Sequence, residues 1–341
     1  MRIIIDAMGG DNAPSAAVHG AVDAAREFGI DITLVGDADA IESCLREKNA
    51  GADGEHIRVV PTSEVITMED EPSMAVRVKN DSSMAVGLRL LSRGEGDAFV
   101  SAGSTGALLS GATMTVRRVK GIRRAALAPV VPNAGHGVLL IDCGANIECT
   151  DEYLLQFAYM GSFYAKNIMG LENPRVSQLN IGVEAGKGGQ RREEAYDVLK
   201  AAGDAGRINF TGNIEAREAM LGHTDVLVCD GFTGNIFLKT VEGTALFLLK
   251  ELKGAFLSSL KNKLGALLLK GGVMAIKDKV DVSETGGTIM LGLRRTVVKA
   301  HGSSNARAFR SAIKQAVGFV EADVIGEIER NVEYMKLDKE S

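Results

Sequence analysis

The stretch "DGFTGN", residues 230–235, follows the apolar run "VLVC" (226–229) and leads into "IFLKTVEG", which has the apolar spacing of a helix. The same order of features, an apolar run, then polar residues with glycine, recurs in "DAMGGD" (6–11), "SAGSTGA" (101–107) and "DCGAN" (142–146). Strands that end in glycine-rich loops before helices are typical of parallel sheets. We therefore predict an α/β fold with one or more mostly parallel sheets covered by helices on both faces.

Short β-branched runs alternate with helical patterns along the whole chain. The predicted strands lie near residues 2–5, 32–35, 57–60, 97–101, 137–141, 176–181, 207–210 and 225–229. The predicted helices cover residues 14–28, 38–48, 73–92, 105–118, 151–169 and 191–202. No low-complexity linker interrupts the pattern, so residues 1–341 are predicted to form a single integrated unit.

Composition and charge exclude several classes of protein. The chain has 341 residues, 45% of them hydrophobic, 40 glycines and a net charge of −5, which predicts a globular protein without a general attraction for nucleic acid. No apolar run approaches the roughly 18 residues of a membrane span, and the acid in "MRIIID" indicates a first strand rather than a signal peptide. The four cysteines lack metal-ligand spacing and are predicted to be reduced thiols in a cytoplasmic protein.

The glycine-rich loops predict an anion site. Ligands of parallel α/β sheets bind at the carboxyl ends of strands, so we expect all four loops to face one cleft. A glycine loop before a helix offers backbone N–H groups to phosphate, and Ser104 and Thr105 add hydroxyls. A tight packed turn is the alternative for any single loop. Asp6, Asp11, Asp142 and Asp230 are interpreted as helix caps or loop-fixing groups, and no metal or other cofactor is predicted.

Two basic side chains are further candidates. Lys187 lies in "GVEAGKGG" (182–189), which is one residue short of a nucleotide-binding P-loop and lacks its hydroxyl. Its cation suits phosphate or a developing oxyanion, although an isolated lysine is more often a solvated one. His301, in "AHGSSNA" (300–306), is a candidate acid or hydrogen-bond donor, with a structural role as the alternative.

Six separated segments together carry a family resemblance: "MRIIIDAMGGDNAP", "SAGSTGAL", "DCGAN", "FTGNIEARE", "VCDGFTGNIFLKT" and "AHGSSNA". In this order, from Met1 to about Asn331, they closely resemble the bacterial phosphate acyltransferases, the acyl-carrier-protein:phosphate transacylases. Ser104 and Gly189 stand where that family commonly has asparagine. The resemblance implies transfer of a long fatty acyl group from acyl carrier protein to inorganic phosphate at the start of phospholipid synthesis. It also implies a homodimer, peripheral membrane association and a fold similar to isocitrate and isopropylmalate dehydrogenases and phosphotransacetylases.

Loops and resemblance together define the predicted site. Catalytic roles are predicted for Lys187, Asn235 and His301, which would stabilise phosphate or the charge that develops on transfer. Phosphate or substrate binding is predicted for Asp6, Gly9, Gly10, Asp11, Ser101, Gly103, Ser104, Thr105, Gly106, Asp142, Asn146, Asn213, Asp230, Gly231, Thr233 and Gly234. No GxSxG elbow or Cys/His pair indicates an acyl-enzyme nucleophile, so direct attack by phosphate is the simpler mechanism.

Two further segments suggest partners. "RRVKGIRR" (117–124) is either a solvated helix end or a docking patch for the acidic acyl carrier protein. Residues 244–275 form a predicted amphipathic helical segment. Its leucine stripe indicates either a helix pair packed in the core or in a dimer, with bends at Gly254 and Gly265, or an interfacial segment on anionic lipid. The predicted membrane-contacting residues are Phe256, Leu260, Leu264 and Leu267.

Three other functions stay open at this point. A phosphotransacetylase-like enzyme would use a coenzyme A thioester and need neither a lipid-facing segment nor a docking patch. A non-catalytic membrane scaffold would leave the polar loops without a role. A nicotinamide-dependent dehydrogenase is disfavoured because the sequence lacks the GxGxxG fingerprint.

Overall fold

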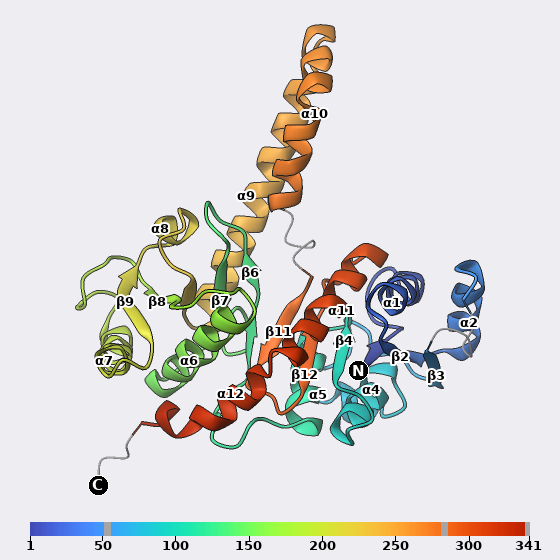
Figure 1. Ribbon diagram of the computed structural model, residues 1–341, viewed down its shortest axis with the longest axis horizontal. Helices are drawn as coiled ribbons and strands as arrows, with labels where there is room; N and C mark the ends of the chain where they lie inside the picture. Colours follow the sequence, from blue (N-terminus) through green and yellow to red (C-terminus); the bar gives the residue numbers. More distant parts are fainter. Residues whose placement is uncertain (51–55, 281–285, 338–341) are drawn as a thin grey trace.

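The computed structural model describes residues 1–50, 56–280 and 286–337, with side chains described as far as 274 in the second range, and contains two β-sheets flanked by helices (Figure 1). The seven-stranded sheet has the order β3-β2-β1-β4-β12-β11-β5, and the five-stranded sheet has the order β6-β7-β10-β8-β9. The strands are β1 (Arg2–Asp6), β2 (Asp31–Gly36), β3 (Ile57–Pro61), β4 (Ala98–Ser101), β5 (Ala126–Ala128), β6 (Val130–Val131), β7 (Val138–Ile141), β8 (Arg175–Leu179), β9 (Asn209–Ile214), β10 (Val226–Val228), β11 (Thr288–Leu291) and β12 (Thr296–Lys299).

The helices cover both faces of these sheets (Figure 1). They are α1 (Ser15–Phe28), α2 (Ala38–Glu47), α3 (Ala75–Val78), α4 (Ser83–Ser92), α5 (Thr105–Thr115), α6 (Asp151–Asn167), α7 (Gln190–Asp204), α8 (Ala216–Met220), α9 (Gly231–Leu257), α10 (Leu260–Val280), α11 (Ala306–Glu321) and α12 (Val324–Asn331), followed by the 3₁₀ helix η2 (Val332–Met335).

All eight predicted strands are present and pair in parallel with their neighbours. The sequence patterns missed β5, β6, β11 and β12. Of these, β12 joins β4 in parallel, while β5, β6 and β11 add antiparallel edges. No helix separates β5 from β6 and β7 or β11 from β12, so these strands fall outside the strand–helix alternation on which the prediction rests. The predicted helix over 73–92 is two helices, because Ser82 caps a new helix start at α4.

The apolar strands alternate between two cores. Ile3 and Ile5 of β1 pack in one core with α1 and α11, whereas Ile4 packs on the opposite face with α4 and α5. Successive side chains of a strand point to opposite faces, so a strand buried on both sides needs a continuous apolar run. Each core contains residues of both sheets, including Leu139 in the first and Leu140 in the second.

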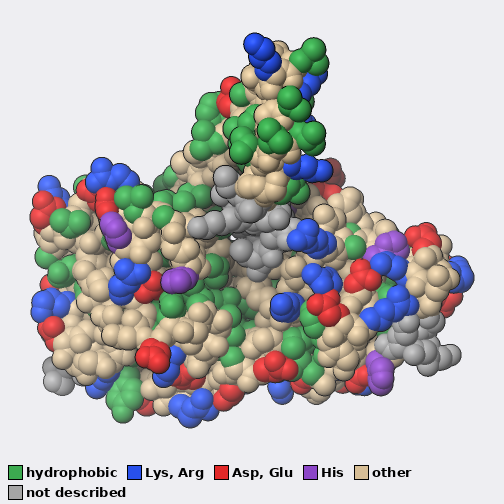
Figure 2. All heavy atoms as spheres, turned by 45° about the horizontal axis from the view of Figure 1, so that its top comes forward, with side chains coloured by type: hydrophobic (Ala, Val, Ile, Leu, Met, Phe, Trp, Pro, Cys, Tyr) green, Lys and Arg blue, Asp and Glu red, His purple; other side chains and the backbone are tan. Residues whose placement is uncertain are grey.

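Helices α9 and α10 form a hairpin that projects from the body of the protein (Figure 1). The prediction of bends at Gly254 and Gly265 is wrong, because both residues lie within continuous helices and the chain reverses at Ser258 and Ser259 instead. Asn262 fixes this reversal through hydrogen bonds from Nδ2 to the Ala255 carbonyl and the Ser258 hydroxyl. Hydrophobic side chains crowd the hairpin surface next to lysines (Figure 2).

The predicted membrane-contacting residues lie on this hairpin. Leu260, Leu264 and Leu267 are 84%, 63% and 66% exposed, while Phe256 is half-buried. None of the helices in the described part of the chain combines the length and the hydropathy that crossing a membrane requires.

Candidate active site

The loops after β1 and β4 are organised by one buried carboxylate. Asp6 accepts hydrogen bonds of 2.6 Å from the hydroxyls of Ser83 and Ser101 and one of 3.2 Å from the Met8 N–H. Burial raises the pKa of Asp6, and these hydrogen bonds only partly oppose the increase. Asp6 therefore joins β1, β4 and the start of α4 at the carboxyl edge of the larger sheet.

Glycines allow the loops after β1, β4 and β12 to interlock. A Cβ added at Gly9 would lie 2.7 Å from the backbone nitrogen of Gly103. Gly10 has φ +98°, and a Cβ there would lie 2.9 Å from the Gly302 carbonyl oxygen. Asp11 N–H donates to that same carbonyl at 2.8 Å. Larger residues at Gly9 or Gly10 would force these backbones apart.

His301 extends this first group of loops to β12. Its exposed ring accepts the Ser303 N–H at Nδ1, over 3.3 Å, and lies 2.9 Å from the Ser303 hydroxyl. An Nδ1 that accepts a backbone N–H places the proton of a neutral ring on Nε2. The outer nitrogen of His301 is thus available as a donor.

Helix α5 begins directly after the loop of β4. Ser104 is its buried N-cap and accepts the Ala107 N–H at 3.5 Å, which leaves its own O–H free to donate. Thr105 and Gly106, the first two residues of the helix, are exposed. First-turn N–H groups have no partner within their helix, so this end of α5 presents donors and positive dipole to an incoming anion.

A second group of loops follows β7 and β10, in the smaller sheet. Asp142 is fully buried and accepts hydrogen bonds from four backbone N–H groups and the Asn146 side chain, at 2.7 to 3.3 Å. Burial raises the pKa of Asp142, with these bonds opposing the increase. Asn146 also donates to the Ala125 carbonyl at 2.8 Å. Asp142 thereby holds the loop against β5 of the larger sheet.

Helix α9 begins two residues after β10, so residues 231–235 of the predicted glycine-rich loop form its first turns, and the loop after β7 closes its N-terminus. Asp230 is the N-cap and accepts both the N–H and the hydroxyl of Thr233, at 2.8 and 2.9 Å. Gly231 N–H donates to the Asn146 carbonyl at 2.7 Å. A Cβ at Gly234 would lie only 1.9 Å from the Asp142 carbonyl oxygen. These contacts use most donors of the first turn.

Asn235 and Lys187 lie at the edge of this second group. Asn235 is exposed on α9, with its Nδ2 beside Gly144 of the loop after β7. Lys187 is exposed on the loop that precedes α7. Asn180 and Asn213 anchor that loop by donating to the carbonyls of Lys187 and Glu184, both at 2.9 Å.

Two residues missed by the sequence patterns belong to the site region. Arg192, on α7, donates to Asp230 at 3.1 Å and to the Thr233 hydroxyl at 3.3 Å, which ties the Lys187 loop to α9. Lys299 ends β12 and is buried against the loop after β4. A lysine at the end of the apolar strand "TVVK", two residues before His301, is a signal that could have identified it.

The predicted residues therefore form two groups, one at the carboxyl edge of each sheet. The positive charge of Lys239, two turns into α9, acts on Lys299 of the first group, so this part of α9 approaches it. That interaction supports the expectation of one shared cleft, which stays a prediction.

The cysteines near the site are poor nucleophiles. Burial raises the pKa of Cys149 to about 12 and also raises the pKa of Cys143 and Cys229. Only a thiolate attacks a thioester efficiently. These environments agree with the prediction of direct attack by phosphate.

The basic segment 117–124 is partly engaged within the protein. Arg123 forms an ion pair of 3.1 Å with Glu152, and Arg124 lies over the Tyr153 ring. The helix predicted to extend to residue 118 ends at Thr115. With about 1.5 Å per residue, α5 separates this segment from Thr105 by roughly 16 Å.

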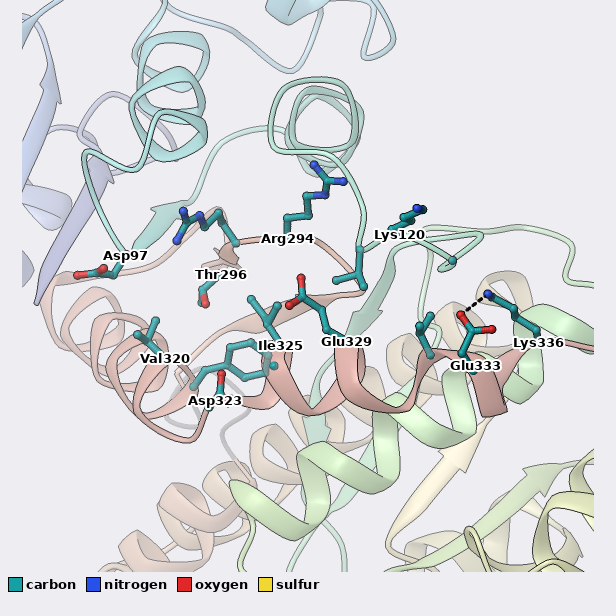
Figure 3. Close-up of a pocket in the computed structure, with 16 residues that line it drawn as sticks. Asp97, Lys120, Arg294, Thr296, Val320, Asp323, Ile325, Glu329, Glu333 and Lys336 are labelled. Atoms are coloured by element: carbon teal, nitrogen blue, oxygen red, sulfur yellow. Dashed lines mark hydrogen bonds and ion pairs between the residues drawn. The ribbon is translucent and has the colours of Figure 1, made fainter.

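Two other features lie away from the candidate site. A cavity of about 940 Å³ at the amino ends of β4 and β12 has four acidic and four basic side chains in its lining, so it offers no net field for an anion (Figure 3). In the described part of the chain, one group fits a metal ion: His19, Cys44 and Glu47, whose ligand atoms lie within 4.8 Å of one another between α1 and α2. None of the four strand-end acids belongs to it.

The fold, with two mostly parallel sheets flanked by helices, is shared with solved structures of phosphotransacylases. A phosphotransacetylase from Streptococcus pyogenes matches with a TM-score of 0.62, 17% identity and coverage of 96% of this chain and 94% of that one. A branched-chain phosphotransacylase from Enterococcus faecalis V583 matches with a TM-score of 0.56, 16% identity and coverage of 94% and 99%. At these identities the likeness shows the fold alone, and it confirms the predicted fold class.

Sequence comparison identifies the family. The profile of the family described as "Fatty acid synthesis protein" matches residues 1–327. A phosphate acyltransferase from Clostridioides difficile (strain 630) is 45% identical over 329 residues, which cover 96% of this chain and 95% of the relative. A phosphate acyltransferase from Alkaliphilus oremlandii (strain OhILAs) is 46% identical over 332 residues, with 97% of both covered. The chain belongs to the phosphate acyltransferase family, as its sequence motifs predicted.

Proposed function

We propose that this acyltransferase transfers a long-chain fatty acyl group from acyl carrier protein to inorganic phosphate, releasing acyl phosphate and free carrier protein. Family membership over nearly the whole chain supports the reaction. The observation that carries the site assignment is the open N-terminus of α5, with the Ser104 hydroxyl and the exposed Thr105 and Gly106.

The residues divide into direct and supporting roles in this proposal. Ser104, Thr105 and Gly106 hold phosphate, and Lys187, Asn235 and His301 stabilise charge on the thioester oxygen or the leaving thiolate. The other predicted binding residues shape the loops through the contacts described above. The two sheets act as one unit, because each core contains side chains of both.

Positioning supplies much of the catalysis in this mechanism. A phosphate oxygen attacks the thioester carbon, the carbon–sulfur bond breaks, and the leaving thiolate takes up a proton. Holding phosphate beside the carbonyl removes up to roughly 7–11 kcal/mol of the barrier in ideal cases. The acyl group passes directly to phosphate, without an acyl-enzyme.

The central experiment measures release of carrier-protein thiol from a long-chain acyl donor with and without inorganic phosphate. Release is expected only with phosphate, and the product should react with hydroxylamine. Equal release without phosphate would identify a thioesterase. A covalent acyl-protein that forms without phosphate, detected by mass spectrometry, would contradict direct attack. Equal activity with coenzyme A thioesters would favour the phosphotransacetylase-like alternative.

Lys187 is tested by Lys187→Ala, which should lower kcat by about 10²–10³, the range for loss of one charge-stabilising donor. Lys200→Ala is a matched control, because Lys200 is exposed on α7 and pairs with Asp204. Wild-type turnover in folded Lys187→Ala protein would remove Lys187 from the site.

Carrier-protein docking is tested at the basic segment. Replacing the exposed Arg117 by Glu should raise the KM for acyl carrier protein substrate and weaken its salt dependence, while leaving the Glu152 and Tyr153 contacts intact. An equal rise in KM for a short acyl thioester without the carrier protein would show that this segment is not a docking surface.

The hairpin of α9 and α10 is proposed to place a cytoplasmic homodimer on the inner, anionic face of the membrane. Its exposed leucines need an apolar cover, and a lipid surface or a second copy provides one. Replacing Leu260 and Leu264 by Glu should abolish flotation with anionic liposomes while soluble activity survives. If wild-type protein never floats and the double variant becomes monomeric, the stripe is a dimer contact instead. A scaffold without catalysis would show flotation but no phosphate-dependent release.

A further inference from the structure

Lys299 carries a positive charge into the interior of the protein. It is the last residue of β12, pairs in register with Ser101 of β4, and has only 9% of its surface exposed. Burying an ammonium group is costly unless an anion compensates its charge. The roles proposed above do not use this lysine.

The contacts of Lys299 tie it to the loop that leads into α5. Its Nζ donates to the Ala102 carbonyl at 3.2 Å and to the Ala300 carbonyl. An ammonium group has three N–H donors, so one remains after these two bonds. Ala102 lies two residues before the N-cap Ser104, which brings the cation close to the open end of the helix.

Within residues 1–50, 56–280 and 286–337, charged side chains act on Lys299 but none forms an ion pair with it. Asp6 and Asp11, from β1 and the loop after it, favour its charged form, whereas Lys239 of α9 disfavours it. Burial is the largest influence and lowers the pKa of Lys299 to about 8. Among the described residues, Nζ has the two carbonyls as its partners and no carboxylate at ion-pair distance.

An unpaired buried cation beside an open helix N-terminus is an arrangement that attracts an anion. We propose that Lys299 is a phosphate-binding residue, whose ammonium compensates the charge of the phosphate held at the N-terminus of α5 and whose third N–H donates to it. This inference rests on the proposed function and adds a residue to its phosphate site.

Phosphate binding should then be linked to proton uptake. A bound anion favours the charged form of Lys299, so the pKa of Lys299 rises when phosphate binds. Near pH 7 the ammonium is already charged and almost no proton is taken up. At pH 8.5, half a unit above a free pKa of about 8, roughly three quarters of a proton should be taken up for each anion bound.

The experiment is titration calorimetry of the full-length protein, in buffers of different ionisation enthalpy, at pH 7.0 and pH 8.5. Sulfate is the primary probe, because it is a tetrahedral dianion that does not titrate in this range, so any proton taken up goes to the protein. Inorganic phosphate is measured alongside as the substrate.

Variants assign the proton to Lys299. Lys299→Met should weaken sulfate binding at pH 7.0 by at least tenfold and abolish the uptake at pH 8.5. The arginine of Lys299→Arg stays positively charged at both pH values, so this variant should bind sulfate without taking up a proton. Lys48→Met is the control, because Lys48 is a partly buried lysine already paired with Asp23, at 2.8 Å, and should change neither quantity.

Proton uptake by the wild-type protein tests the proposal even if a variant fails to fold. Absence of proton uptake with sulfate at pH 8.5, or absence of anion binding, would overturn the assignment, as would wild-type affinity in folded Lys299→Met. The proposed reaction can fail separately: linked anion binding without phosphate-dependent thiol release would keep the Lys299 site and reject the acyl transfer. Phosphate-dependent thiol release without proton uptake on anion binding would keep the acyl transfer and reject the Lys299 site.

Discussion

Helices α5 and α9 begin in the same way in sequence and differently in space. Both follow a buried strand and begin at a polar N-cap, Ser104 in α5 and Asp230 in α9, although a glycine precedes the cap of α5 while those after β10 lie inside α9. In α5 the next two residues are exposed. In α9 Gly231 and Gly234 are buried, and the first-turn donors bond to Asn146 and Asp230.

The difference shows that one sequence pattern serves two purposes. The closed end of α9 fixes the smaller sheet to the larger one through Asp142, which leaves little room for a ligand. The open end of α5 leaves donors for an anion. We expect substitutions to affect mainly stability at α9 and mainly phosphate use at α5.

Replacing the two buried carboxylates, Asp142 and Asp6, should give the largest difference in unfolding free energy. Asp142→Ala removes a shared acceptor from four backbone N–H groups, two of them in buried bonds, and should cost about 4 kcal/mol of unfolding free energy. Asp6→Ala should cost about half as much, because its donors from Ser83 and Ser101 are hydroxyls that can rotate to other acceptors. Urea unfolding measures both. Equal losses would show that the first group is as rigidly closed as the second.

Replacing Gly234 and Gly106 should give the next largest difference in stability. Gly234→Ala places a Cβ 1.9 Å from a backbone oxygen and should cost about 3 kcal/mol or more, whereas Gly106→Ala meets only the Pro72 side chain, at 2.9 Å. Gly106→Ala should cost less, about 1–2 kcal/mol, since the Pro72 ring must shift while alanine favours the helix. Thermal unfolding of the two variants provides the measurement. A tolerated Gly234→Ala would mean that the start of α9 is not closed.

Ser104 should combine a small effect on stability with an effect on phosphate. Ser104→Ala removes an N-cap, which costs about 1 kcal/mol, and removes a proposed donor, so the KM for phosphate should rise. Ser82→Ala is the matched control, because Ser82 caps α4 by accepting the Ala85 N–H at 3.3 Å. It should lose similar stability with unchanged KM. The same KM change in both variants would place phosphate elsewhere.

Arg192 should give the smallest effect on stability. Arg192→Met breaks a partly exposed ion pair and should cost no more than about 1 kcal/mol. Hydrogen exchange at the Thr233 amide should nevertheless become faster, because Arg192 holds Asp230 and Thr233 together. Arg191→Met, at an exposed pair with Glu148, is the control. Unchanged exchange at Thr233 would show that the closure of α9 does not need Arg192.

The sequence predicted the parallel framework well because strands buried on both faces are continuous apolar runs and amphipathic helices have a local period. It did not predict β5 or β11, since they pair antiparallel with each other and lie outside the alternation of strands and helices along the chain. It identified His301 but not Lys299, because a lysine is expected at the surface unless its surroundings are known.

The sequence by itself determined the α/β class, the strand-end loops and the family, because these depend on residue order and local spacing. Only the tertiary structure decided that the loops divide between two sheets, that α5 is open while α9 is closed, and that Lys299 is buried near Asp6 and Lys239. Burial, hydrogen-bond partners and charge interactions depend on residues far apart in the chain. Asp142 and Asp6 follow their strands alike in sequence, and only their partners distinguish them.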